Sequence, residues 1–271
     1  MDHDFKEEID PILDGDLLEE IEGENFSEEN SDTYREEPGH GKWFFRFVAL
    51  VIIFAFAALF MPDLTLFLSD RMDFLAQNRE LLSDEIVQAS KPAVVSIEAY
   101  RAGQADLGIT RGTGFNISTN GRIITNHHVV NNAESVTVSF EDGRKYFARS
   151  YEVIPGADVA VIELAADNLP ILTLNESNLV QNGDTVTIIG NPLGFENISQ
   201  RGQVGKFHNW GENTVPIFDI DIPINPGNSG SPVLNRQGEV VGIIFASTTY
   251  ETDGQTEYHA LAIPVQFLEL K

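Results

Sequence analysis

The chain has 271 residues and a formal net charge of −25 at pH 7, from 42 acidic and 17 basic side chains. A surface of this sign does not displace the counterions of a nucleic acid, so the balance argues against nucleic-acid binding. Cysteine is absent, which excludes disulfide bonds and thiolate chemistry but leaves the cellular compartment open.

The first 41 residues form a strongly acidic segment. They hold 16 Asp and Glu against Lys6 and Arg35, and few large apolar side chains. Such a segment cannot bury enough apolar surface to offset the entropy of ordering, so residues 1–41 are predicted to be a disordered acidic tail. Within it, IDPILDGDLLEEI (9–21) has spaced apolar residues, and a short helix formed on a partner is the alternative for this stretch.

An apolar run follows, GKWFFRFVALVIIFAFAALFMPD. Trp43 to Met61 spans 19 residues with only Arg46 charged. A helix of roughly 20 apolar residues crosses a bilayer core of about 30 Å, and an arginine near its end can reach the headgroups. Residues 42–62 are therefore predicted to be a transmembrane helix, with residues 43–61 in the lipid bilayer.

A cleaved signal peptide and a buried helix are the alternatives for this run, and AFA (55–57) resembles a cleavage site. A signal peptide begins with a short basic region, whereas about 40 acidic residues precede this run. The run is also too uniformly apolar for a buried helix. Lys42 and Arg46 flank its N-terminal end, so the positive-inside rule predicts a cytoplasmic N-terminus and an extracytoplasmic segment 63–271.

Residues 63–90 have apolar side chains near helical spacing and few helix breakers. Ser83, followed by two acids, is the expected N-cap of a helix that ends near Lys91. We expect residues 63–82 to be a helical connector and residues 83–271 to be the folded domain.

From residue 93 to residue 265 the chain consists of short Val- and Ile-rich runs separated by polar turns. The runs are AVVSIEAY, GTGFNIS, GRIITN, SVTVSF, VAVIEL, DTVTIIG and EVVGIIF, and the turns are NG (120–121), DG (142–143), NG (182–183), QG (237–238) and DG (253–254). Many short strands with glycine-containing turns predict an all-β sandwich or barrel. About 170 residues suffice for two small barrels.

One loop, PINPGNSGSPV (223–233), places Ser229 between two glycines and between prolines. Glycine permits φ > 0 and proline fixes φ, so the loop is stiff and presents one hydroxyl and several backbone N–H groups. For an isolated G-x-S-G, a tight turn is the more common explanation. Chemistry at a serine also requires a base and a group that fixes the tautomer of that base.

Two of the six histidines, His127 and His128, lie in RIITNHHVV, where an apolar strand is expected to run into a polar tip. Adjacent residues on a strand point to opposite faces, so only one of the pair can face a given site. The same divergence argues against a metal site, which no HExxH motif or cysteine cluster supports. The other histidines, which lie in the tail or in polar stretches without a motif, are His3, His40, His208 and His259.

An acid that could orient a histidine occurs in YEVIPGADVAVIELA, where Asp158 precedes an apolar run. Taken alone, an acid at the start of a strand is more often a turn residue. In chain order, however, Asp158 follows His128 by 30 residues and precedes Ser229 by 71.

The three segments RGTGFNISTNGRIITNHHVV, ADVAVIEL and INPGNSGSPV together resemble the HtrA/Deg family of trypsin-like serine proteases from bacteria and organelles. The family motifs read approximately GSGF-x-I-x(3)-G-x-I-x-TN-x-HVV, D-[LIV]-A-V-[LI] and INPGNSGGP. IIGNPLGFENISQRGQVG (188–205) and LAIP (261–264) extend the resemblance, which covers roughly residues 83–268.

The resemblance implies a trypsin-like double β-barrel that uses neither a metal ion nor a cofactor. It assigns the catalytic histidine to His128, since the variable residue of the motif precedes the histidine of HVV, and it completes the triad with Asp158 and Ser229. It also implies homotrimerisation and action on protein or peptide substrates.

The family pattern places the oxyanion hole at Gly227, Asn228 and Ser229, with the N–H groups of the first and the last as donors. It makes Ile224 and Asn225 substrate-binding residues. An apolar Ile224 in the S1 pocket implies small or medium aliphatic side chains, such as Val, Ile or Ala, at the P1 position of the substrate.

Two features depart from the family. Ser231 replaces the second glycine after the nucleophile, and its Cβ would perturb the loop if that residue needed φ > 0. No PDZ sequence follows the protease-like segment.

The expected function is that of a membrane-anchored serine endopeptidase of the bacterial cytoplasmic membrane, which cleaves unfolded or membrane-proximal proteins in quality control or stress response. The alternative is a catalytically silent scaffold that binds peptides or partners.

Overall fold

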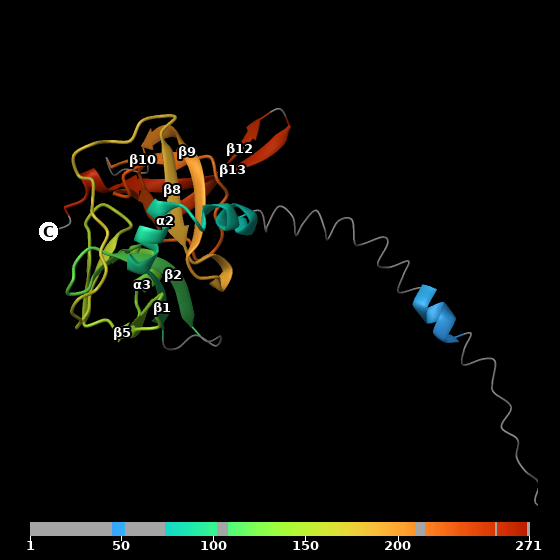
Figure 1. Cartoon of the computed structure of the whole chain (residues 1–271), viewed down its shortest axis with the longest axis horizontal. Coiled ribbons are helices and arrows are strands. Elements are labelled where there is room, and N and C mark those ends of the chain that lie inside the picture. The colour runs from blue at the N-terminus through green and yellow to red at the C-terminus, as the bar shows by residue number, and fades with distance from the viewer. Residues whose placement is uncertain (1–44, 52–73, 102–107, 210–214, 253, 270–271) are drawn as a thin grey trace, which may run out of the picture. The chain divides into compact units, whose positions relative to one another are not determined.

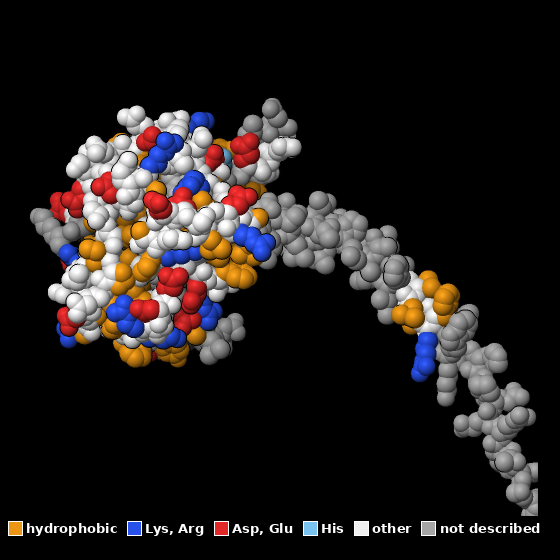
Figure 2. Space-filling model, viewed as in Figure 1, with side chains coloured by type: hydrophobic (Ala, Val, Ile, Leu, Met, Phe, Trp, Pro, Cys, Tyr) orange, Lys and Arg blue, Asp and Glu red, His pale blue; other side chains and the backbone are white. Residues whose placement is uncertain are grey.

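The computed structural model describes residues 45–51, 74–101, 108–209, 215–252 and 254–269 (Figure 1). The chain divides into two units, Met1–Leu59 and Phe60–Lys271. In the first unit residues 45–51 are helical, and Figure 2 shows a cluster of hydrophobic side chains there, from which one basic side chain projects.

The described ranges contain no helix that is long and apolar enough to span a membrane. The acidic tail 1–41 and most of the predicted transmembrane segment 42–62 lie outside these ranges, as do residues 63–73 of the predicted connector.

The described part of the second unit begins with a helix at residues 74–81, followed by α2 (Glu85–Ser90) and the 3-10 turn η1 (Lys91–Ala93). The N-cap of α2 is Asp84, whose carboxylate accepts hydrogen bonds from the amides of Ile86 and Val87. The expectation that Ser83 is the cap was therefore wrong by one residue. A carboxylate caps as well as a hydroxyl and adds a favourable charge at the helix N-terminus.

The first half of the domain is an antiparallel sheet of seven strands in the order β5-β4-β1-β2-β3-β7-β6. The strands are β1 (Val94–Tyr100), β2 (Ile109–Asn116), β3 (Arg122–Thr125), β4 (Ser135–Phe140), β5 (Lys145–Phe147), β6 (Ser150–Val153) and β7 (Ala160–Glu163), with helix α3 (His127–Val130) after β3. The sheet curls around a core of side chains such as Ile97, Ile123 and Ile162.

The second half is a closed barrel of six strands in the order β10-β13-β12-β11-β8-β9. Its elements are β8 (Thr185–Gly190), the 3-10 turn η2 (Pro192–Gly194), β9 (Ile198–Asn209), β10 (Pro216–Ile220), β11 (Pro232–Leu234), β12 (Val240–Thr252), β13 (Gln255–Pro264) and the 3-10 turn η3 (Val265–Phe267). Phe218, Ile220 and Ile244 fill its interior. A further core joins the two halves, because Phe115 and Ile124 of the first pack in one cluster with Leu234 and Ile243 of the second.

The all-β prediction is confirmed. The seven predicted runs form β1, β2, β3, β4, β7, β8 and β12. The second half closes as a barrel, whereas the first is a sheet that ends at the short edge strands β5 and β6. The strands that the pattern did not predict are polar or short: β9, for example, reads ISQRGQVGKFHN and buries few residues beyond its first three.

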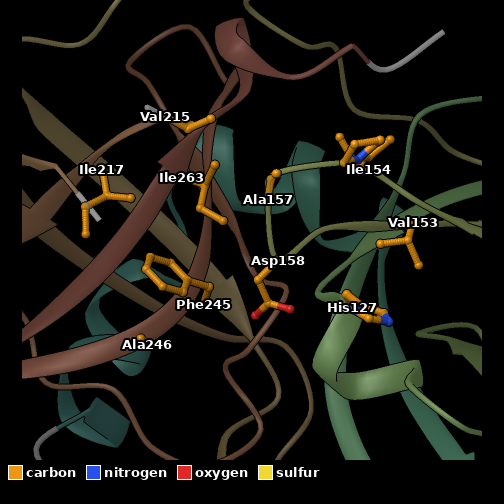
Figure 3. A pocket seen from close by; sticks show the side chains of 12 residues that line it. His127, Val153, Ile154, Ala157, Asp158, Val215, Ile217, Phe245, Ala246 and Ile263 are labelled. Carbon is orange, nitrogen blue, oxygen red and sulfur yellow. The ribbon is translucent and has the colours of Figure 1, made fainter. Parts of the chain in front are cut away.

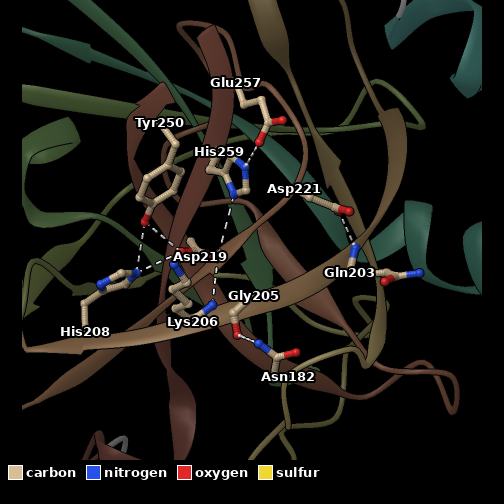
Figure 4. A network of polar contacts seen from close by, with 10 residues as sticks. All are labelled: Asn182, Gln203, Gly205, Lys206, His208, Asp219, Asp221, Tyr250, Glu257 and His259. Carbon is tan, nitrogen blue, oxygen red and sulfur yellow. Dashed lines mark hydrogen bonds and ion pairs between the residues drawn. The ribbon is translucent and has the colours of Figure 1, made fainter. Parts of the chain in front are cut away.

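A polar network ties the outer face of β10 to β9 and β12 (Figure 4). At its centre is Asp219, whose side chain is 2% exposed. Its Oδ2 accepts a hydrogen bond from the Tyr250 hydroxyl at 2.8 Å and lies 2.8 Å from His208 Nε2, while its Oδ1 accepts from the Lys206 amide at 3.0 Å. Burial alone would raise the pKa of Asp219. The hydrogen bonds from His208, Tyr250 and Lys206, with the charge of His259, hold it below its ordinary value.

We expect Tyr250→Phe to lower the free energy of unfolding by about 2 kcal/mol, since a hydrogen bond to a buried carboxylate is lost. For a domain of this size the loss corresponds to a Tm lower by about 4–8 °C. Burial and the Asp219 carboxylate raise the pKa of Tyr250 from 10.0 to about 12. The contribution of the hydroxyl is therefore complete below about pH 10 and is lost as the pH rises through about 12.

The matched control is Tyr258→Phe on the same hairpin, because the Tyr258 side chain is exposed and makes no hydrogen bond among the described residues. Denaturant titrations between pH 7 and pH 12 measure the effect. The stability gap between wild type and Tyr250→Phe should stay constant up to about pH 10 and then narrow. A gap that widens with pH would contradict the assignment.

Candidate active site

The histidine pair lies at the start of α3, immediately after β3 ends. The expected strand ends at Thr125, and Asn126 has extended dihedrals before the single turn of helix. Adjacent residues on a helix lie about 100° apart, so the two rings still diverge. His127 lines the cavity described below, whereas His128 contacts Asp158.

Asp158 binds His128 with both carboxylate oxygens. Its Oδ2 lies 2.5 Å from His128 Nδ1, and its Oδ1 accepts the His128 backbone N–H at 2.9 Å. The side chain of Asn126 donates to the Asp158 carbonyl at 2.8 Å, which holds the turn between β6 and β7 in place. A carboxylate at Nδ1 keeps the proton on that nitrogen, so Nε2 is left with its lone pair as a base.

This pair is open to solvent on one side. The side chains of His128 and Asp158 are 46% and 31% exposed. The Arg101 guanidinium donates to the His128 carbonyl at 2.9 Å and to the Asn131 carbonyl at 2.7 Å, so it caps the end of α3. A histidine held by its backbone on both sides can present its ring to a substrate without reordering.

Ser229 lies in the loop between β10 and β11, and residues 226–230 are called the serine loop below. Thr113 of β2 binds this loop twice: its N–H donates to the Ser229 carbonyl at 2.8 Å and its hydroxyl donates to the Gly227 carbonyl at 2.7 Å. A Cβ built on Gly112 would lie 2.7 Å from the Val129 side chain and 3.2 Å from the Ser229 carbonyl. The serine loop and α3 thus both pack against Gly112, so residue 229 lies beside the helix that carries His128.

Two glycines of the serine loop have conformations that exclude other residues. Gly227 has φ +103° and Gly230 has φ +87°. A Cβ on Gly230 would lie 2.0 Å from the Thr113 carbonyl, and one on Gly227 would lie 2.3 Å from the Asn191 carbonyl. Ser229 lies between glycines because the loop packs tightly against β2 on one side and against residue 191 on the other, where a side chain at position 227 or 230 would not fit.

Ser231 does not disturb the loop. It is fully buried and is not among the described residues with positive φ. Its hydroxyl lies over Gly190, where a Cβ would approach Ser231 Oγ to 2.3 Å. A glycine at position 190 therefore provides the space that a serine at position 231 needs.

The backbone N–H groups of the serine loop differ in their partners. Asn228 N–H donates to the Asn225 carbonyl at 3.1 Å. Among the described residues neither Gly227 N–H nor Ser229 N–H has an acceptor. Of the three residues expected at the oxyanion hole, the first and the last therefore keep a free donor, while Asn228 closes the turn.

The remaining candidates have mixed surroundings. Ile224 is partly buried against the barrel core, and Asn225 uses its carbonyl for the turn to Asn228.

Across the described part of the chain, Ser229 Oγ makes no hydrogen bond to His128. Such bonds are often long in the absence of substrate and shorten when it binds. Sequence reasoning missed the roles of Arg101, which lies in no motif, and of Thr113, which lies in the quoted GTGF segment but was given no role there.

A cavity of about 580 Å³ opens next to Asp158, between the two halves of the domain. Figure 3 shows the Asp158 carboxylate between Phe245 on one side and His127 on the other. The turn before β7 contributes one wall and β10, β12 and β13 contribute the other. The apolar lining side chains are Val153, Ile154, Pro155, Ala157, Val215, Ile217, Phe245, Ala246 and Ile263. A mostly apolar cavity with a few polar side chains, here His127 and Asp158, has the usual composition of a ligand pocket.

Comparison with known proteins gives a consistent result. Residues 112–243 match the model of the trypsin-like peptidase domain. A protein of Chlamydia trachomatis serovar D named "Probable periplasmic serine endoprotease DegP-like" is 41% identical over 152 residues, which are 54% of this chain and 30% of that protein. A protein of the same name from Hahella chejuensis is 40% identical over 156 residues, 57% of this chain and 33% of that protein. The chain thus spans about a third of the length of these relatives.

Two solved structures share the fold. The active form of the Rv3671c protease from M. tuberculosis superposes with a TM-score of 0.58 at 25% identity, over 68% of this chain and 81% of that one. The HtrA-type protease AlgW with a tripeptide gives a TM-score of 0.57 at 29% identity, over 67% of this chain and 59% of that one.

Proposed function

Because the chain belongs to the trypsin-like serine proteases of the HtrA/Deg type, we propose that it is a serine endopeptidase with His128, Asp158 and Ser229 as its catalytic triad. The observation that carries the proposal is the 2.5 Å contact between Asp158 and His128 Nδ1, next to a serine loop with two free N–H groups.

In the proposed reaction Ser229 Oγ attacks the carbonyl carbon of the scissile peptide bond, and His128 Nε2 accepts the hydroxyl proton. The imidazolium that forms is stabilised by the Asp158 carboxylate. His128 then gives this proton to the leaving amine as the C–N bond breaks. A water molecule attacks the acyl-enzyme in the second half, with His128 again as the base, and releases the carboxylic acid and Ser229.

The negative charge that develops on the carbonyl oxygen needs donors that are already in place. The free N–H groups of Gly227 and Ser229 suit this role, because they need not break a bond within the protein to bind an oxyanion. Loss of one such donor typically lowers kcat by about 100- to 1000-fold.

The substrate is proposed to be an extended polypeptide with small or medium aliphatic side chains at P1. Ile224, packed against the barrel core, supplies an apolar wall, and the cavity beside Asp158 supplies further apolar surface. A peptide library should therefore be cut after Val, Ile or Ala, and Ile224→Ala should shift the preference towards larger aliphatic residues by enlarging the pocket. A profile dominated by Arg or Lys at P1 would exclude this assignment.

The place of action proposed for the enzyme is the extracytoplasmic face of the bacterial cytoplasmic membrane. Support comes from the 19-residue apolar run 43–61 with Arg46 at its N-terminal end and from relatives named as periplasmic. A tether of this kind favours unfolded or membrane-proximal substrates, as in quality control or stress response, and is compatible with a homotrimer of protease domains.

A serine-directed fluorophosphonate probe tests the enzymatic proposal on the full chain in detergent. Labelling that disappears in Ser229→Ala supports a working nucleophile. Absence of labelling in the folded wild type would favour the alternative, a scaffold of protease fold that binds peptides without cutting. That alternative is favoured by one observation, the missing hydrogen bond between Ser229 and His128.

A further inference from the structure

One segment, residues 191–199, lies between the N-terminal helix 74–81 and the serine loop, and is called the bridging segment below. It follows β8, includes the turn η2, and leads into β9. Nothing in the proposed chemistry uses its side chains. Its contacts on both sides nevertheless connect the helix to the residue that would supply an oxyanion donor.

Towards the serine loop the bridging segment makes backbone contacts. Leu193 N–H donates to the Pro226 carbonyl at 2.8 Å. Asn191 N–H donates to the hydroxyl of Thr113 at 2.9 Å, and that hydroxyl donates to the Gly227 carbonyl. The peptide group before Gly227 Cα, which contains the Gly227 N–H, is thus held by Leu193. The peptide group after it is held by the Thr113 hydroxyl, which itself accepts the Asn191 amide.

Within the bridging segment the Asn191 side chain closes a loop. Its Oδ1 accepts the Asn197 N–H at 2.9 Å and its Nδ2 donates to the Val95 carbonyl at 3.0 Å. Leu193 and Asn197 both have φ +54°, in the left-handed region that non-glycine residues rarely adopt. Such conformations persist only where the surroundings hold them.

On the side of the bridging segment away from the serine loop, the helix 74–81 provides the contacts that keep this segment in its conformation. The ring of Phe74, which is 4% exposed, meets the Phe195 ring edge to face, with centroids 6.1 Å apart. Asn78 Oδ1 accepts the Ser199 N–H at 2.9 Å. Gln77 Nε2 donates to the Arg201 carbonyl at 2.9 Å, which adds β9 to the contact.

We propose that the helix 74–81 acts as a positioning element for the oxyanion site, with Phe74 and Asn78 holding the bridging segment so that Gly227 N–H stays in place. The inference rests on the proposed function, because it assigns Gly227 to the oxyanion hole. It adds that the part of the chain preceding the protease fold sets the catalytic rate through one continuous set of contacts.

Hydrogen exchange of the full chain tests the structural half of this proposal without reference to activity. The variants are Asn78→Ala and Phe195→Ala, which remove a contact from each side at modest cost to the core, and the control is Glu80→Ala on the exposed face of the same helix. Peptides that cover residues 191–197 and 226–231 should exchange about tenfold faster in the first two variants, as expected when one hydrogen bond or ring contact is lost. Exchange equal to that of Glu80→Ala overturns the proposal, whether or not the protein cleaves peptides.

Kinetics test the catalytic half. A small displacement of an oxyanion donor costs kcat about 10- to 100-fold. We expect this loss in Asn78→Ala with KM nearly unchanged, and recovery in Asn78→Asp, which keeps an acceptor oxygen for Ser199 N–H. If Asn78→Ala changes KM but not kcat, or if Asn78→Asp does not restore kcat, the positioning role is overturned. A wild type that neither cleaves nor labels refutes the proposed function instead, and the exchange data still decide the structural half.

Discussion

Ser229→Ala is expected to lower kcat for a peptide substrate by about 10⁶-fold. The hydroxyl is the only side-chain group that bonds covalently to the substrate carbonyl in the proposed reaction, so the other triad members cannot compensate for its loss. The residual rate, about 10³- to 10⁴-fold over water, comes from binding and from the oxyanion donors that remain. Steady-state hydrolysis of a fluorogenic peptide with an aliphatic P1 residue measures both numbers.

The matched control is Ser231→Ala, two residues along the same chain segment. Ser231 Oγ is buried and has no hydrogen-bond partner among the described residues, so its removal leaves no group newly unpaired. We expect activity and Tm of this variant near those of the wild type. Equal activity of Ser229→Ala and wild type would exclude Ser229 as the nucleophile.

Asp158→Asn is expected to lower kcat by about 10⁴-fold while KM changes little. In the native protein Asp158 Oδ1 accepts the His128 backbone N–H and Oδ2 faces Nδ1. An asparagine that keeps the first bond turns its NH₂ group towards Nδ1. The ring must then carry its proton on Nε2, where the reaction requires a lone pair, so the base is blocked although its position is kept.

Asp142→Asn is a suitable control for this variant, because Asp142 lies in the turn after β4 of the same sheet and pairs with Arg144 at the surface. Its pKa is lowered chiefly by the Arg144 amide and then by the Arg144 guanidinium. Exposed pairs of this kind contribute little to stability, so kcat and Tm should hardly change. If Asp158→Asn kept full activity at pH 7, the orienting role would have to be withdrawn.

The sequence predicted the strands whose apolar residues form a long run or a regular alternation, and it missed strands that are short or partly polar. VAVIEL and DTVTIIG are nearly continuous apolar runs, and both form strands. The segment QTEYHALAIP forms the ten-residue strand β13, but its first half is exposed and polar, so it has no apolar periodicity. It pairs with β12 along its whole length, with one register shift between Ile244 and Ala246, and pairing of this kind is not encoded in one strand alone.

The candidate site was predictable where a motif existed. The spacing of His128, Asp158 and Ser229 pointed to the chemistry, and the histidine and the aspartate do meet in the fold. The contacts of the supporting residues were not predictable. Thr113 lies in GTGF and Asn191 in GNPLG, two segments that carry the family resemblance, but a motif does not tell which groups these side chains bind. Their roles depend on which backbone groups lie opposite them, and that follows only from the packing of the two halves.

The position of Thr113 has a consequence for how activity and folding are related. This residue of the first sheet holds two carbonyls of the second barrel, accepts the Asn191 amide, and through its own carbonyl binds the Thr125 hydroxyl. Besides the core that joins them, each half has a core of its own, so each half keeps its shape when the polar contacts of Thr113 between the halves loosen. Inactivation by heat or by denaturant should then precede global unfolding. An assay of catalysis would report the loss of contact between the two halves rather than the unfolding of either half.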